Sequence, residues 1–157
     1  MRTTENGNDA GMTLLGTDAV QTEPLFMIAE EQPAIRELLR WMLHLAGYRK
    51  VVCVDRQAVL TWEEQTMIPA ALSAILLLDL SSLCAYEAAE FLGRVRARWQ
   101  VCFTVPPQII VLTTYPNVQA SLGSRECVLL KPFHVRDLLA LIRQAMETIS
   151  LSEGRLG

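Results

Sequence analysis

The sequence has no long apolar segment, no paired cysteines and almost no lysine. Charged residues interrupt every apolar stretch before it reaches the roughly 20 residues that span a bilayer, so we expect no membrane segment. The N-terminus shows no basic stretch followed by an apolar one, so no secretory signal is indicated. No C-x-x-C spacing occurs among the four cysteines. Three of them lie in apolar surroundings and are expected to be buried free thiols, which favours a reducing cytoplasm.

Several motifs that define other kinds of protein are also missing. The sequence contains no glycine-rich phosphate loop, no serine nucleophile elbow and no zinc motif. The formal net charge is −3, and residues 1–24 carry all of it, which leaves the rest of the chain neutral. A neutral domain gives no electrostatic reason to expect a nucleic-acid partner.

The pattern of apolar runs predicts one α/β domain over residues 25–150. Residues 1–24 are poor in apolar periodicity and are expected to be a flexible tail, and residues 151–157 a C-terminal tail. Strands are predicted at 25–29, 51–54, 74–79, 108–113 and 127–130. Helices are predicted between and after them, at 33–46, 56–66, 86–99, 117–122 and 135–149. The predicted inner stripe of the first helix consists of Ile35, Leu38, Leu39 and Met42. This alternation indicates a doubly wound, five-stranded parallel sheet with helices on both faces.

Polar residues of complementary charge follow four of these strands. Glu30 and Glu31 follow the first strand, Asp79 ends the third, Thr113 ends the fourth and Lys131 follows the fifth. Sites in doubly wound folds lie outside the carboxyl ends of the strands, so these side chains are expected to meet at one edge of the sheet.

Such a set of residues suits a phosphoryl group and a divalent cation. Asp79 would be the nucleophile that forms an acyl phosphate, with charge neutralised by a metal ion and a fixed cation. For Mg²⁺, which prefers octahedral oxygen ligation, Glu31, Asp79 and the backbone carbonyl of Ser81 are candidate ligands, and Glu30 would bind through water. Lys131 would pair with the phosphoryl group or with Asp79.

Thr113 completes this set, because its hydroxyl is placed to donate a hydrogen bond to the phosphoryl group and so to sense whether the site is occupied. Each residue also has a purely structural interpretation. The two glutamates suit the turn before a helix, where the helix dipole favours acids, and Asp79 can cap the next segment. Thr113 can bond to backbone at a strand end, and Lys131 can be an ordinary surface lysine. The combination at one sheet edge favours a functional site.

In these residues the chain resembles the receiver domain of two-component response regulators over about residues 25–149. The resemblance rests on four motifs: the acidic pair with Pro33 to Leu39, the run Leu76 to Leu80 around Asp79, the run Ile109 to Thr113, and Lys131-Pro132-Phe133. The resemblance implies strand order 2-1-3-4-5, Mg²⁺ at the acidic site, a histidine kinase or phosphotransfer protein as partner, and a cis peptide bond before Pro132.

The chain departs from the family pattern at several places. Glu31 stands where the family usually has Asp, and its extra methylene moves the carboxylate about 1.5 Å further from the backbone. Because Mg²⁺ tolerates poor geometry badly, the glutamates Glu30 and Glu31 predict a low affinity for the metal. Residues 82–85 lack the family's Met-Pro and the glycine a few residues on. Val128 occupies the position of the family's aromatic switch residue, and the short spacing from Thr113 to Lys131 predicts a short fourth helix.

Two hypotheses follow from the resemblance. In the first, the chain is a stand-alone cytoplasmic receiver, phosphorylated on Asp79, that signals through contacts with a downstream protein in trans and can form a homodimer. In the second, it is a degenerate receiver that binds a partner without phosphorylation. A third reading is a phosphatase of the haloacid dehalogenase type, which needs a second Asp two residues after the nucleophile. Ser81 stands there, so an enzyme is not expected.

Overall fold

The computed structural model describes residues 23–61, 73–102, 107–122 and 127–155, which form alternating strands and helices. The strands are β1 (Leu25–Ala29), β2 (Val51–Cys53), β3 (Ala74–Asp79), β4 (Gln108–Thr113) and β5 (Cys127–Leu130). The helices are α1 (Pro33–Leu45), α2 (Arg56–Thr61), α3 (Ala85–Cys102), α4 (Pro116–Leu122) and α5 (Val135–Arg155). The predicted strands agree with these bounds to within one residue.

The five strands form one parallel sheet in the order β2-β1-β3-β4-β5. β3 lies at the centre, between β1 and β4, and each of its residues is buried. A strand covered on both faces must be apolar throughout, which explains why Ala74 to Leu78 show no alternation with polar residues. The predicted fold class and strand order are confirmed.

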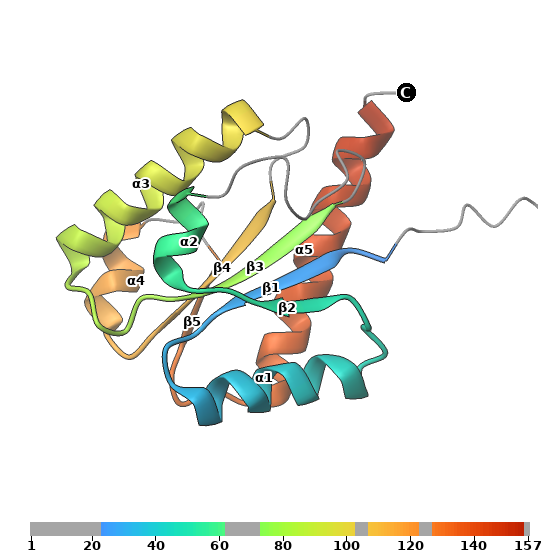
Figure 1. Cartoon of the computed structure of the whole chain (residues 1–157), viewed down its shortest axis with the longest axis horizontal. Coiled ribbons are helices and arrows are strands. Elements are labelled where there is room, and N and C mark those ends of the chain that lie inside the picture. Colours follow the sequence, from blue (N-terminus) through green and yellow to red (C-terminus); the bar gives the residue numbers. More distant parts are fainter. Residues whose placement is uncertain (1–22, 62–72, 103–106, 123–126, 156–157) are drawn as a thin grey trace, which may run out of the picture.

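Helices cover both faces of the sheet (Figure 1). Two hydrophobic layers fill the space between the sheet and these helices. On one face, Phe26, Leu77 and Leu112 pack with residues of α1 and α5, among them Leu43 and Ile142. The opposite face carries α2, α3 and α4. Its core residues include Met27, Leu76, Leu78, Val111, Val59, Phe91, Leu92, Val95, Trp99 and Val118. Successive strand residues alternate between the two layers, as the pleat of a strand requires.

Proline and glycine set the two ends of α1. Pro33 occupies the first turn, where its missing N–H costs no helical hydrogen bond. At the other end Gly47 has a φ of +96°, and the Tyr48 N–H donates to the carbonyl of Leu43. This left-handed residue closes the helix as glycine does at a C-terminal cap. The predicted inner stripe was wrong at Leu38, which is 49% exposed, because the buried face is centred on Leu39, Met42 and Leu43.

Other differences from the predictions concern helix ends and cysteines. The last helix was expected to end at Ile149 but continues to Arg155, so residues 151–155 of the expected tail are helical. α3 is likewise longer than predicted. The second half of the helix expected at 56–66 lies outside the described residues, as do residues 1–22 of the N-terminal tail.

The prediction of three buried thiols was wrong. Cys53 and Cys84 are exposed and Cys127 is partly buried.

Two remaining expectations concern the backbone and membrane segments. The peptide bond between Lys131 and Pro132 is cis, as the resemblance implied. Within the described ranges, no helix combines the length and the apolar character needed to cross a bilayer.

Candidate functional site

The parallel register brings the ends of the central strands to one edge of the sheet. Asp79, the last residue of β3, lies opposite Leu112 of β4, and Thr113 lies opposite Leu130 of β5. Two backbone hydrogen bonds continue this register into the loops. The Leu80 N–H donates to the Leu112 carbonyl over 2.8 Å, and the Lys131 N–H donates to the Thr113 carbonyl over 2.8 Å. Asp79 and Lys131 are therefore placed by the sheet itself.

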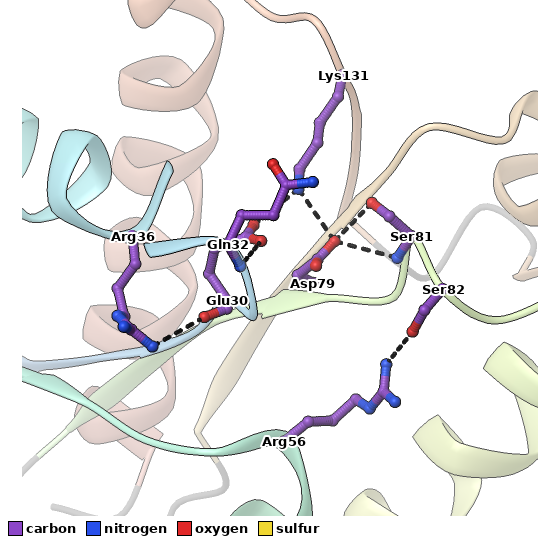
Figure 2. Close-up of polar contacts among 8 residues, drawn as sticks. All are labelled: Glu30, Gln32, Arg36, Arg56, Asp79, Ser81, Ser82 and Lys131. Atoms are coloured by element: carbon purple, nitrogen blue, oxygen red, sulfur yellow. Dashed lines mark hydrogen bonds and ion pairs between the residues drawn. The ribbon is translucent and has the colours of Figure 1, made fainter. Parts of the chain in front are cut away.

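Lys131 joins two carboxylates that come from different strands (Figure 2). Its Nζ lies 2.7 Å from Oε2 of Glu30 and 3.1 Å from Oδ1 of Asp79. The side chains of all three residues are almost inaccessible to solvent. We call these three residues the inner cluster. The cluster contains two carboxylates and one ammonium group. It lies in a site shielded from water, where an unpaired charge raises the free energy of the folded chain.

Ser81 gives the Asp79 carboxylate two further hydrogen bonds. The Ser81 N–H donates to Oδ1 of Asp79 over 3.0 Å, and the Ser81 hydroxyl donates to the same oxygen over 2.6 Å. Oδ1 thus accepts from three donors, including Lys131. The contacts of Ser81 with Asp79 run through its amide and hydroxyl, whereas the sequence led us to propose its carbonyl as a metal ligand, and that role stays a prediction.

The pKa values of the two carboxylates in the inner cluster are shifted in opposite directions. Burial alone would raise the pKa of Asp79, but the hydrogen bonds from Ser81 and the charge of Lys131 bring that pKa below its ordinary value. Burial raises the pKa of Glu30 above its ordinary value, and the nearby charge of Asp79 raises it further. Hydrogen bonds from Lys131 and Gln32 lower the pKa but do not cancel this rise. Asp79 therefore loses its proton at a lower pH than Glu30 does.

Glu31, the neighbour of Glu30, belongs to a separate set of contacts at the rim. Its side chain is 54% exposed, whereas that of Glu30 is 0% exposed. Oε1 of Glu31 pairs with the guanidinium of Arg56 at 3.2 Å, and Arg56 also donates to the hydroxyl of Ser82 over 2.6 Å. The guanidinium carbon lies 5.9 Å from the ring centroid of Phe91. We call Arg56, Glu31 and Ser82 the rim cluster.

Thr113 is fully buried at the end of β4. Its hydroxyl oxygen accepts a hydrogen bond from the Tyr115 N–H over 3.2 Å. This contact is the strand-end role that the sequence allowed for a threonine. The hydroxyl hydrogen is not used in that bond, and the role of occupancy sensor stays a prediction.

The acidic residues as arranged do not fit a Mg²⁺ ion bound by Glu31 and Asp79. Across the described ranges, no group of three or more His, Cys, Asp or Glu side chains is positioned to hold a metal. Glu31 is engaged by Arg56, and the two carboxylates that remain share the Lys131 ammonium. Mg²⁺ requires near-ideal octahedral geometry, and this set offers it two carboxylates already paired to a cation. We therefore derive no chemical step through a metal.

Reasoning from the sequence missed Arg56 and Ser82. A signal for Arg56 was present, because it lies three residues after the end of β2, at the same edge of the sheet as the other site residues. The predicted site residues follow the other four strands, and none of them follows β2. Gln32 was also missed. Its N–H donates to Oε1 of Glu30 over 3.1 Å and so orients that carboxylate toward the inner cluster.

Solved structures share this fold. A response regulator described as CheY-like, from Mesorhizobium loti, matches with a TM-score of 0.57 and 15% identity, covering 78% of this chain and 98% of that one. A pilus assembly-related protein from Burkholderia pseudomallei matches with a TM-score of 0.54 and 20% identity, covering 78% and 89%. No family model and no curated protein matches the sequence.

At sequence identities of 15% and 20%, the similarity to these structures establishes the fold alone. The chain has the doubly wound α/β fold of response regulator receiver domains, with the sheet order and cis bond that the resemblance implied. Both matched structures are covered almost completely, so the likeness extends over a whole domain of that kind.

Proposed function

We propose that this chain is a receiver module that accepts a phosphoryl group on Asp79 and transmits a signal through protein–protein contacts. The observation that supports this most directly is the inner cluster, in which Lys131 lies 3.1 Å from Asp79 at the carboxyl edge of the central strands. Fold alone does not define function. The proposal therefore depends on this geometry and on Thr113 at the end of the neighbouring strand.

The chemistry uses groups that this chain holds in place. An oxygen of the ionised Asp79 carboxylate attacks phosphorus, an O–P bond forms and the bond from phosphorus to the donor breaks. With a phosphohistidine donor, the leaving imidazole nitrogen takes the electron pair and gains a proton. Lys131 offsets the charge that builds between two anions, and such preorganised charge is a large term in phosphoryl transfer. The lowered pKa of Asp79 keeps the nucleophile ionised at neutral pH.

A histidine kinase or phosphotransfer protein is the proposed donor, and α1 offers it a surface. Three large apolar residues lie along the outer side of α1 at helical spacing: Leu38, Trp41 and Leu45, which are 49%, 59% and 68% exposed. Residues at this spacing share one helix face. An exposed aromatic with aliphatic neighbours is typical of a contact surface for another protein. We name these three residues the α1 stripe.

The test is the intact mass of the full chain after incubation with a small acyl phosphate. We expect one phosphoryl group on the wild type, none on Asp79→Ala, and one on Asp55→Ala, which removes an exposed acid at the same edge of the sheet. Circular dichroism would establish that each variant is folded. A folded wild type that gains no mass, with and without Mg²⁺, contradicts the proposed phosphoryl transfer.

Two observations favour a second candidate, a binding module that works without phosphorylation. Glu31 is paired to Arg56 rather than directed at Asp79, and Val128, which is partly buried, replaces the aromatic of the family's switch. In this case partner binding is the same for the wild type and for Asp79→Ala. A binding difference that depends on the phosphodonor would instead support the first candidate.

A further inference from the structure

Arg56 is held in place by three different kinds of contact. Its guanidinium pairs with Glu31 from the β1–α1 loop, donates to Ser82 from the β3–α3 loop and lies against the ring of Phe91 on α3. The side chain of Arg56 is 16% exposed although it belongs to the rim. A guanidinium has a planar fork of donors, and so many fixed partners leave it little freedom. Arg56 thus connects the two loops that flank Asp79.

This position has a consequence for Glu31. Glu30 and Glu31 are adjacent, yet only Glu30 pairs with Lys131 and only Glu31 pairs with Arg56. Figure 2 shows Lys131 beside Glu30 and Asp79, and Arg56 beside Ser82. The positive charge of Arg56 beside Glu31 disfavours a second cation at the same carboxylate. The inner cluster then has two acids and one cation, and a metal entering it would have to displace or repel Lys131.

We propose that Arg56 determines which cation serves this site, because it holds Glu31 away from Asp79 and thereby makes binding of a divalent metal weak. Lys131 remains the fixed cation of the inner cluster, and Arg56 binds the carboxylate that a metal would need. This role concerns the site proposed above for phosphoryl transfer and rests on that proposal only for the identity of the site.

The test is the affinity of the unphosphorylated full chain for Mg²⁺, measured by titration calorimetry. We expect Arg56→Gln to bind Mg²⁺ up to about fivefold more tightly than the wild type, since an ion pair with a half-exposed partner contributes at most about that factor. Arg49→Gln is the matched control, because it removes an exposed arginine before β2, at the opposite edge of the sheet. It is expected to leave the affinity unchanged.

Two further variants link any gain to Glu31. We expect Glu31→Gln to leave the weak affinity of the wild type unchanged, and the double variant Arg56→Gln/Glu31→Gln to lose the gain. Arg56→Lys, which keeps the charge but not the fork, is expected to fall between the wild type and Arg56→Gln, and it replaces Arg56→Gln if circular dichroism shows that variant to be unfolded.

Three results would overturn this role of Arg56: no gain in Arg56→Gln, a gain that persists in the double variant, or a wild-type affinity that falls in Glu31→Gln. Each is measured without a phosphodonor. A wild type that fails to accept a phosphoryl group contradicts the proposed function and leaves these metal affinities as they are, so the two failures can be told apart.

Discussion

The inner and rim clusters are built from neighbouring residues, yet their surroundings differ sharply. Glu30 and Glu31 are adjacent in sequence, each pairs with one cation, and each contact joins β1's loop to a distant element. The inner pair is enclosed by the sheet edge, whereas the glutamate of the rim pair is half exposed. The two ion pairs therefore differ mainly in how far they are shielded from water.

The energetic consequence follows from solvation. A charge left unpaired in a shielded site has lost its water and gained nothing in return, so breaking a buried pair costs about 3–5 kcal/mol. An exposed pair is worth about 0–1 kcal/mol, because water and salt screen it. We therefore expect the inner cluster to determine stability and the rim cluster to determine mainly which groups reach Asp79.

The largest expected effect is that of Lys131→Met. This change leaves Glu30 and Asp79 together without a cation, and we expect the free energy of unfolding to fall by about 3 kcal/mol. Urea denaturation followed by circular dichroism measures it. The control is Lys50→Met, which removes the other lysine of the sequence, an exposed one. It should change stability by less than about 0.5 kcal/mol. If both variants lose the same free energy of unfolding, the inner cluster contributes no more to stability than an exposed lysine does.

The next effect is a pH dependence with opposite signs for the two buried acids. The pKa of Asp79 is lowered in the folded chain, so its contribution to stability is present above its ordinary value of 3.8 and is lost as pH falls through the lowered value. The pKa of Glu30 is raised, so the folded chain binds more protons above 4.5, and its contribution grows as pH falls toward 4.5.

Urea denaturation at a series of pH values checks these signs. Relative to Asp79→Asn, the wild type should lose stability below pH 3.8, and relative to Glu30→Gln it should gain stability as the pH falls from neutral to 4.5. These effects should be smaller than that of Lys131→Met, since a proton can neutralise a buried acid but no group replaces the missing cation. The same sign for both acids would contradict the opposite pKa shifts of Asp79 and Glu30.

Much of the fold was predictable because its signals are local. Apolar runs of four to six residues marked β1, β3, β4 and β5, and the fully apolar run at 74–79 marked the central strand. Helix ends were less well predicted. Nothing in the sequence stops α5 at Ile149, and no proline or glycine follows until Gly154. The buried face of α1 was misplaced by part of a turn, because apolar residues occur on both sides of that helix.

The candidate site was predictable as a location but not as a set of contacts. Parallel topology brings residues after strand ends to one edge, and this placed Asp79 and Lys131 correctly. Which of two adjacent glutamates faces inward depends on the backbone after Ala29, where the Gln32 N–H bonds to Glu30. Arg56 reaches Glu31 and Ser82 through a long side chain, and sequence spacing contains no information on that reach.

A smaller effect on stability is expected from breaking the rim cluster. Arg56→Gln should lower the free energy of unfolding by no more than about 1 kcal/mol, because Glu31 stays solvated when its partner is lost. The difference from the wild type should shrink in 1 M NaCl, where the Debye length is about 3 Å. The loss in Lys131→Met should persist at that salt concentration. A loss in Arg56→Gln that is large and independent of salt would show that the rim cluster is as enclosed as the inner one.

The smallest effect on stability is expected at the α1 stripe, which belongs to neither cluster. Trp41 is 59% exposed, so Trp41→Ser removes few buried contacts and should change the free energy of unfolding by less than about 0.5 kcal/mol. Labelling of Asp79 by a small acyl phosphate should not change, because that donor needs no docking surface. Labelling by a histidine kinase that phosphorylates the wild type should fall at least about tenfold, as for a residue that contributes more than 1.4 kcal/mol at an interface.

Tyr86→Ser is the matched control for Trp41→Ser. Tyr86 is another exposed aromatic, at the start of α3, and α3 packs on the opposite face of the sheet from α1. Labelling by the kinase should survive this change. If both variants lose labelling by the kinase, or neither does, then α1 is not the docking surface. If Trp41→Ser also loses labelling by the small donor, the change has reached the inner cluster, and the separation between surface and site assumed here is wrong.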